Sequence, residues 1–252
     1  MSFDVPAEAY DRFMGVHSRQ LAPQLADLAK LSSGDRALDV GCGPGALTAE
    51  LVARLGAGSV AAVDPSESFV AAARARHRDI DVRRASAESL PFADHAFDAA
   101  LAQLVVHFMT DPVAGLCEMA RVTRSEGVIA ACVWDHAGER TPVSTFFRAA
   151  RDLGLPTRDE SARAGAREGH LVELFKASGL RDVEQTVLVA RVEYSSFDDW
   201  WKPLSFGVGP AGAAYAALRP DQRARVRERC EVLLPPPPFE LASFAWAARG
   251  TV

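Results

Sequence analysis

The chain has 252 residues, of which 48% are hydrophobic and 24% are charged, a composition typical of globular proteins rather than of disordered ones. Its formal net charge is −5, so a dedicated nucleic-acid-binding surface is not expected. No apolar run approaches the length of a membrane span, and the first residues lack the basic and apolar regions of a signal peptide. The four cysteines have neither metal-type nor disulfide-type spacing. We therefore expect one domain over 1–252, a cytoplasmic location, no membrane partner and no metal.

The amino-terminal segment predicts one or two amphipathic helices over residues 5–31. Leucines at 21, 25, 28 and 31 recur at helical spacing and provide a face that can pack on a sheet. The segment 1–33 is either a packing helix or a lid over a ligand, because lids are often built from such segments.

The stretch 36–55 predicts a strand, a glycine turn and a helix. A strand-like run at 36–40 leads into Gly-Cys-Gly-Pro-Gly at 41–45, and an Ala/Leu-rich segment with helical spacing follows at 46–55. Glycine suits such a turn because it adopts backbone angles that a Cβ forbids and lets a ligand approach the backbone closely. This order is typical of the first unit of a nucleotide-binding sheet.

A second strand is expected at 59–64, and it ends in Asp64, 23 positions after Gly41. An acidic residue at about this spacing, at the end of the next strand, is placed to accept hydrogen bonds from ribose hydroxyls. The alternative is a helix N-cap, because Pro65 and Ser66 follow.

Further strands are expected at 80–85, 97–102 and 128–134, with helices at 69–77 and 112–123 and a turn at 125–127. The alternation over 34–135 predicts an α/β fold, an open and mostly parallel sheet with helices on both faces. Beyond it, segments 136–179 and 195–235 are expected to be helical inserts that form a cap. Strands are expected at 180–194 and 239–250, and the second of them would close the edge of the sheet.

Five motifs occur in order: Leu-Asp-Val-Gly-Cys-Gly-Pro-Gly at 38–45, Val-Asp-Pro-Ser at 63–66, Ala-Glu-Ser-Leu-Pro-Phe at 87–92, Phe-Asp-Ala-Ala-Leu-Ala at 97–102 and Glu-Met-Ala-Arg-Val-Thr-Arg-Ser-Glu-Gly at 118–127. Together they resemble the class I S-adenosylmethionine-dependent methyltransferases, and most of all the small-molecule group that includes the ubiquinone/menaquinone-biosynthesis enzymes. The resemblance implies a Rossmann-like seven-stranded sheet whose last strand is antiparallel.

The resemblance also implies a cofactor, S-adenosyl-L-methionine, with S-adenosyl-L-homocysteine as the product. The cofactor contacts that it implies are Tyr10, Arg19, Asp39, Gly41, Cys42, Gly43, Gly45, Asp64, Pro65, Ser66, Ser86, Ala87, Glu88 and Gln103. At position 86 this chain has serine, where the family more often has aspartate or asparagine.

The reaction implied is in-line transfer of a methyl group to an unidentified small-molecule acceptor, carried mainly by orientation and by exclusion of water. If the acceptor needs deprotonation, His107 is the candidate base and His136 a weaker one; the alternative for His107 is a packing histidine between Val106 and Phe108. Four aromatic residues either form apolar walls of the acceptor pocket or are ordinary core residues: Phe146, Phe147, Trp200 and Trp201.

Two other functions remain open. An NAD-dependent oxidoreductase is possible because Gly41, Gly43 and Ala46 fit the dinucleotide pattern and Asp64 fits the ribose acid. A non-catalytic cofactor-binding scaffold is also possible, because a fold and a cofactor do not fix an activity. We expect no nucleic-acid partner and a monomer or homodimer.

Overall fold

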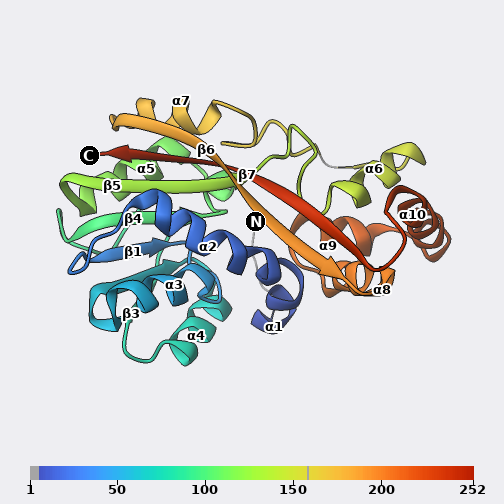
Figure 1. Ribbon diagram of the computed structural model, residues 1–252, viewed down its shortest axis with the longest axis horizontal. Helices are drawn as coiled ribbons and strands as arrows, with labels where there is room; N and C mark the ends of the chain where they lie inside the picture. The colour runs from blue at the N-terminus through green and yellow to red at the C-terminus, as the bar shows by residue number, and fades with distance from the viewer. Residues whose placement is uncertain (1–5, 158) are drawn as a thin grey trace.

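A seven-stranded sheet forms the centre of the molecule (Figure 1), and the computed structural model describes residues 6–157 and 159–252. The first five residues of the predicted lid lie outside the described residues. In space the strand order is β3-β2-β1-β4-β5-β7-β6. The strands are β1 (Ala37–Val40), β2 (Val60–Asp64), β3 (Asp81–Arg84), β4 (Phe97–Gln103), β5 (Thr123–Trp134), β6 (Arg181–Tyr194) and β7 (Phe239–Thr251).

The mostly parallel Rossmann-like sheet predicted from the sequence is confirmed. Strands β1 to β5 pair in parallel, whereas β7 pairs antiparallel with both β5 and β6. The prediction that the last strand closes the edge was wrong, because β7 lies inside the sheet and β6 forms the edge. Burial explains this order: residues 245–248 of β7 are all buried, as in a central strand, whereas β6 is exposed along much of its length.

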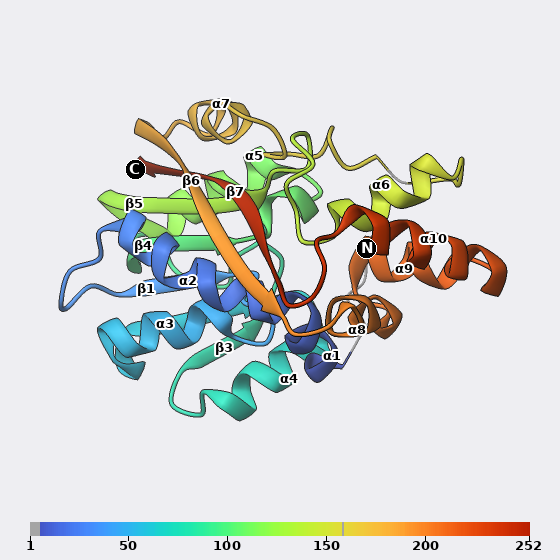
Figure 2. The same cartoon turned by 45° about the vertical axis from the view of Figure 1, so that its right-hand side comes forward.

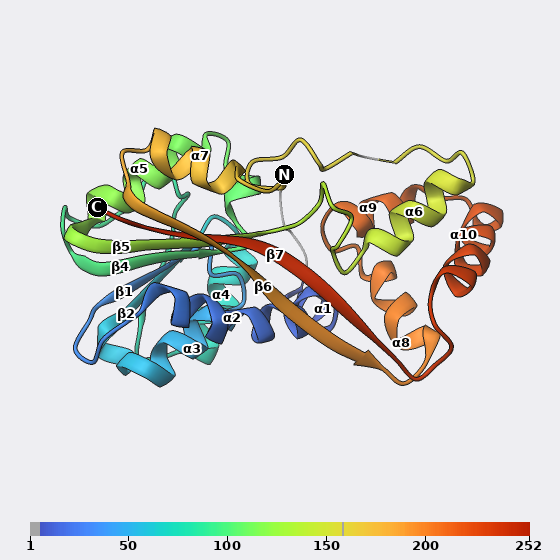
Figure 3. The ribbon, with the colours of Figure 1, turned by 45° about the horizontal axis from the view of Figure 1, so that its top comes forward.

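Helices cover both faces of the sheet. One face carries α2 (Val16–Ala29), α3 (Ala46–Leu55) and α4 (Glu67–Arg76), and the other carries α5 (Pro112–Val122) and α7 (His170–Ala177) (Figure 3). Leu21 and Leu25 of α2 are fully buried against the first face, and Leu116 of α5 and Phe175 of α7 against the second. Burying such a side chain contributes about 1.5–3 kcal/mol.

Strand β5 starts earlier than its sequence predicts. The expected turn at 125–127 lies within the strand, since β5 begins at Thr123. The register against β4 jumps from Phe97↔Thr123 to Ala99↔Val128, and Glu126 has a positive φ of 61°. The residues that resembled a turn are therefore extra residues of a bulged strand.

The backbone of the edge strand β6 is partly covered by two glutamine side chains of α2. The amide of Gln24 donates to the carbonyl of Val189 at 2.8 Å and accepts from its N–H at 3.1 Å. Gln20 makes the same pair of bonds with Arg191, at 2.6 and 2.7 Å. The two side chains therefore take the place of a neighbouring strand over this part of the edge.

Strands β6 and β7 run past the rest of the sheet to a cluster of helices (Figures 2 and 3). This helical lobe contains α6 (Ser144–Asp152), α8 (Phe197–Trp201), the 3₁₀ turn η4 (Lys202–Phe206), α9 (Gly209–Ala217) and α10 (Pro220–Leu233). Helices α8, α9 and α10 all lie within the segment 195–235 that was expected to be helical. Helix α7 lies within segment 136–179 but packs on the sheet, because Leu171 and Phe175 join the sheet core.

The first described helices lie between the sheet and the helical lobe (Figure 3). They are α1 (Ala7–Tyr10) and a π-helical turn η1 (Asp11–Gly15) that continues into α2. Two further 3₁₀ turns are η2 (Ala57–Ser59) and η3 (Val106–Phe108). Within the described part of the chain, no helix is long and apolar enough to cross a membrane.

Candidate functional site

A cavity of about 300 Å³ opens at the carboxyl ends of β1, β2 and β4. This edge is where open α/β sheets bind their ligands. The cavity is lined by Tyr10, Gly41, Gly43, Asp64, Pro65, Ser66, Phe69, Arg84, Gln103, Leu104, Val105 and Phe108. Of the cofactor residues expected from the sequence, the structure therefore brings together Tyr10, Gly41, Gly43, Asp64, Pro65, Ser66 and Gln103.

Asp64 links the glycine turn to the start of α4. Its Oδ2 accepts a hydrogen bond from the N–H of Gly43 at 2.8 Å, and its Oδ1 accepts one from the N–H of Ser66 at 2.8 Å. The carboxylate is buried, and this burial raises its pKa. The helix cap that was the alternative role is made by the next polar residue, since the Ser66 side chain accepts from the N–H of Phe69.

Two glycines of the turn are required for different reasons. Gly41 has φ = 72°, and a Cβ on it would lie 2.4 Å from a methyl group of Val105, so no other residue fits without a shift. Gly43 also has a positive φ, of 53°, but a Cβ there would meet nothing within 4 Å. The space beside Gly43 belongs to the cavity, so its backbone is open to a ligand.

Gln103 and Tyr10 connect the cavity to the amino-terminal helices. The Gln103 amide donates to the carbonyl of Ser18 at 3.0 Å, and its Oε1 is buried with no hydrogen-bond partner among the described residues. The Tyr10 ring meets the Phe69 ring edge to face at 5.3 Å. Burial raises the pKa of Tyr10 to about 12, so its hydroxyl stays protonated at neutral pH.

Three expected cofactor residues lie behind the cavity wall. Asp39 is buried, and its Oδ2 accepts from the Thr48 hydroxyl at 2.6 Å; burial raises its pKa to about 7. Cys42 is buried as well, and its N–H donates to the carbonyl of Val63. Gly45 begins α3 beside the His77 ring, with φ = 100°.

Four other expected residues lie away from the cavity wall. The carboxylate of Glu88 accepts from the N–H of Thr110 at 2.7 Å and so ties two loops together. Ala87 is buried, Ser86 is exposed, and Arg19 is exposed on α2.

The sequence did not reveal a link between the glycine turn and the amino terminus. Arg76 of α4 donates to the carbonyl of Pro44 at 3.0 Å and forms an ion pair with Asp11 of the π-helical turn. Residues 11 and 76 are far apart in the sequence, and only the fold brings Asp11 beside Arg76.

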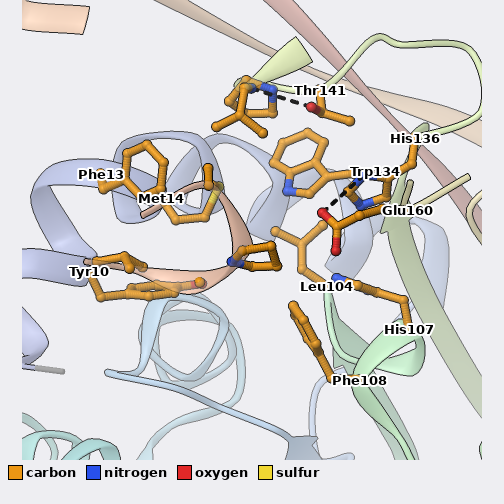
Figure 4. Close-up of a pocket in the computed structure, with 16 residues that line it drawn as sticks. Tyr10, Phe13, Met14, Leu104, His107, Phe108, Trp134, His136, Thr141 and Glu160 are labelled. Atoms are coloured by element: carbon orange, nitrogen blue, oxygen red, sulfur yellow. Dashed lines mark hydrogen bonds and ion pairs between the residues drawn. The ribbon is translucent and has the colours of Figure 1, made fainter. Parts of the chain in front are cut away.

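A second pocket, of about 70 Å³, adjoins the cavity and shares Tyr10, Leu104 and Phe108 with it. Figure 4 shows the labelled side chains around this pocket, with Tyr10, Phe13 and Met14 on one side and His107, His136 and Glu160 on the other. Its wall is mostly apolar. It is completed by Trp134, Thr141, Pro142, Val143, Val208, Gly209, Pro210 and Ala211.

The polar side of this pocket is built around Glu160, which is 7% exposed. Its Oε1 lies 2.7 Å from Nε of Arg163. Its Oε2 lies 3.8 Å from Nδ1 of His136, as the dashed line in Figure 4 marks. Arg163 also donates to the carbonyl of His107 at 3.0 Å, and the His107 and His136 rings lie 5.6 Å apart.

Both histidines of the pocket are uncharged at neutral pH. Burial lowers the pKa of His136 to about 4, and the charge of Arg163 adds to this effect. Burial, His136 and Arg163 hold the pKa of His107 well below its ordinary value.

The four aromatic residues expected around the acceptor do not line this pocket. Phe146, Trp200 and Trp201 are buried in the core of the helical lobe. Phe147 reaches a separate polar cleft of about 350 Å³, which His136, Thr141 and Glu160 share with the pocket.

Several pocket residues had no assigned role in the sequence analysis. The sequence could have indicated Trp134, because it ends a strand at the carboxyl edge of the sheet. It could not have indicated Glu160 and Arg163, since they lie in a polar loop whose path depends on the whole fold. Among the described residues, no group of three or more histidine, cysteine or acidic side chains is placed to hold a metal ion.

Comparison with known proteins identifies the family. A family described as a methyltransferase domain matches residues 38–131. Demethylmenaquinone methyltransferase of Mycobacterium sp. (strain KMS) is 34% identical over 193 residues, which cover 76% of this chain and 79% of the relative. The protein of the same description from Tropheryma whipplei (strain Twist) is 31% identical over 228 residues, with 86% and 90% covered.

A solved structure shows the same fold. The putative methyltransferase of Bacillus halodurans C-125 has a TM-score of 0.61 and 15% identity, and the match covers 91% of this chain and 97% of that one. Nothing in these relatives favours the NAD-dependent oxidoreductase alternative. The chain belongs to the class I S-adenosylmethionine-dependent methyltransferases that act on small molecules.

Proposed function

We propose that this methyltransferase binds S-adenosylmethionine in the larger cavity and methylates a compact, hydroxylated aromatic molecule in the adjoining pocket. The observation that carries the proposal is the shared wall. Tyr10, Leu104 and Phe108 line both spaces, so ligands in the two spaces would be neighbours. A methyltransferase needs this arrangement, because holding both reactants together provides much of the acceleration.

The residues around the larger cavity fit the cofactor. Asp64 presents a buried carboxylate with lone pairs left for ribose hydroxyls, as its two oxygens each accept one backbone bond. Gly43 leaves its backbone open, and the unpartnered Oε1 of Gln103 is suited to a positively charged or N–H-bearing group. When bound, S-adenosylmethionine supplies the activated methyl group.

The remaining contact assignments follow from position. We assign Pro65 and Ser66, with Phe69 and Arg84 beside them, to the adenosine end, since all four line the cavity near Asp64. We assign a supporting role to Asp39, Cys42 and Gly45 behind the cavity wall, and to Ala87 and Glu88, which lie away from it. Arg19 and Ser86 are exposed and do not border the cavity, and we assign them no contact.

The mostly apolar wall of the smaller pocket supports an aromatic acceptor. Phe13, Met14, Phe108 and Trp134 surround the space that an aromatic ring would fill. Imidazole and carboxylate groups on the opposite side accept hydrogen bonds from a hydroxyl. The names of the demethylmenaquinone methyltransferase relatives support a quinol-like acceptor.

The proposal also covers the cellular location, the partners and the oligomeric state of the enzyme. All four cysteines are free thiols, which suits a reducing cytoplasm. The net charge of −5 supports a function without nucleic acid. We propose a monomer or homodimer.

The test is transfer of a labelled methyl group from S-adenosylmethionine to a panel of small molecules. We expect transfer to phenol and 1,4-benzenediol, whose single ring suits a small pocket, and none to aliphatic amines or thiols of similar size. The variant Ala211→Leu narrows only the smaller pocket and should reduce transfer while it leaves the affinity for S-adenosylhomocysteine unchanged. Transfer to amines alone would contradict the proposed acceptor class.

A further inference from the structure

The polar side of the acceptor pocket contains buried hydrogen-bonding atoms without partners. Among the described residues, Nδ1 of His107 and Nε2 of His136 have no hydrogen-bond partner. Leaving one such atom buried and unpaired costs about 1–3 kcal/mol. Two uncompensated imidazoles against one small pocket are costly for stability alone, and they point to a use in the reaction.

The charges around the two histidines are balanced. The pair formed by Glu160 and Arg163 contributes one charge of each sign, and the pair formed by Asp135 and Arg140 does the same behind His136. The remaining titratable group on the pocket wall is Tyr10, which is neutral at neutral pH. Both imidazoles are neutral too and can accept a proton.

The two histidines have different positions along the pocket. His107 lies on η3 next to Phe108, which also lines the cofactor cavity. His136 and Glu160 line both the pocket and the polar cleft beyond it. A line from His107 through His136 to Glu160 therefore leads away from the cofactor cavity and into the cleft.

On the basis of the proposed function, we propose that His107 accepts the proton of the acceptor hydroxyl and that the His136–Glu160 pair leads this proton to the cleft. The O–H bond of the acceptor breaks, an N–H bond forms on the imidazole, and the electron pair stays on the oxygen. The net charge of the pocket is unchanged by this step. The oxyanion is a stronger nucleophile toward the methyl group than the neutral hydroxyl.

Glu160 is a positioning residue in this scheme, because it acts through His136. Its negative charge favours the protonated form of a neighbouring imidazole. A neutral glutamine in its place would keep the shape of the side chain and lose this effect. An aspartate would keep the charge at a slightly greater distance.

The experiment uses 4-nitrophenol, whose absorbance separates the phenol from the phenolate. The protein is saturated with S-adenosylhomocysteine, binding of 4-nitrophenol is measured by calorimetry, and the spectrum of the bound probe is followed against pH. We expect bound phenolate to persist about one pH unit or more below its titration in free solution. His107→Gln and Glu160→Gln should abolish this shift, and Glu160→Asp should restore part of it.

The matched control is Glu173→Gln. Glu173 also pairs with an arginine, Arg167, but the pair is on the surface and outside the pocket, so the control should behave as the unaltered protein. Retained affinity for S-adenosylhomocysteine shows that each variant is folded.

The possible results distinguish the proposed proton route from the proposed acceptor class. A bound neutral phenol in the unaltered protein, or a shift that survives both His107→Gln and Glu160→Gln, would overturn the proton route and leave the acceptor class standing. Failure of 4-nitrophenol to bind a protein that binds S-adenosylhomocysteine would contradict the acceptor class and the proton route together.

Discussion

Three histidines are uncharged in the folded protein at neutral pH: His17 and His107, which are buried, and His136, which is largely buried. Their environments differ, because His107 and His136 line the proposed acceptor pocket while His17 lies on α2 with its Nε2 3.2 Å from the Tyr194 hydroxyl. Burial lowers the pKa of His17 from 6.5 to about 4. Each such residue couples folding to pH, since the unfolded chain binds its proton more readily than the folded one.

The residue-scale prediction concerns His17→Gln. Because the folded pKa is lower than the unfolded one, stability from this group is present above pH 6.5 and is lost as the pH falls toward 4. In the unaltered protein, the contribution of His17 to the free energy of unfolding falls by about 2 kcal/mol between pH 7.5 and pH 5. The free energy of unfolding, measured with denaturant at both pH values, should therefore fall by about 2 kcal/mol less in His17→Gln.

The control is Val232→Ala, which alters an exposed side chain without a titratable group. It should have the same pH dependence as the unaltered protein. If His17→Gln also lost as much stability as the unaltered protein between the two pH values, the buried neutral state of His17 would be excluded.

At this scale the sequence reveals residues that belong to a local motif. Asp64 stands at a fixed distance from the glycine turn and at the end of a strand, so its place at the sheet edge follows from local order. Glu160 and Arg163 are in a polar loop with no periodicity, and they reach the pocket only through packing of distant segments. His107 was identified from its position after a strand, but its partners were not.

At the scale of elements, α2 both packs on the sheet and covers its edge. Its leucines face the core, while Gln20 and Gln24 bond to the backbone of β6. An uncovered edge strand is a site for pairing with another chain. Helix α2 therefore stabilises the fold and limits self-association.

The element-scale prediction is for the double variant Gln20→Ala/Gln24→Ala. It removes four hydrogen bonds to the strand, and we expect a loss of about 2–4 kcal/mol in the free energy of unfolding. We also expect self-association that increases with concentration, measured by light scattering. The control Arg19→Ala changes an exposed residue of the same helix; a double variant as stable and as monodisperse as this control would refute the account of the edge.

Strands β5 and β7 show which features of a strand could not be predicted from the sequence. Residues 125–127 have the composition of a turn, and the parallel pairing with β4 is what holds them in a bulged strand. The apolar run at 245–248 is consistent with either an edge or a central strand until its two neighbours are known. The local sequence determines that a segment forms a strand, whereas the place of that strand in the sheet depends on pairing with segments far away in the sequence.

At the scale of the whole molecule, the proposed acceptor pocket forms where three parts meet. Trp134 comes from the sheet and Leu104 from just after β4, the amino-terminal helices contribute Phe13, and the helical lobe contributes Val208 and Ala211. The long strands β6 and β7 carry the lobe to this position (Figure 3). The sequence predicted that the inserts would cap the acceptor, but the residues on the pocket wall could not be chosen from aromatic content, because the large aromatic side chains fill the core of the lobe.

The most direct test is calorimetric titration with S-adenosylhomocysteine of the unaltered protein, of Asp64→Asn and of the control Asp81→Asn, with NAD as a parallel ligand. Asp64→Asn removes a buried carboxylate whose charged hydrogen bonds contribute about 1.5–3 kcal/mol each. We therefore expect its affinity to fall by about 10-fold or more, with Asp81→Asn unchanged and no binding of NAD. An unchanged affinity in Asp64→Asn would contradict the placement of the cofactor in the cavity at the carboxyl ends of β1, β2 and β4.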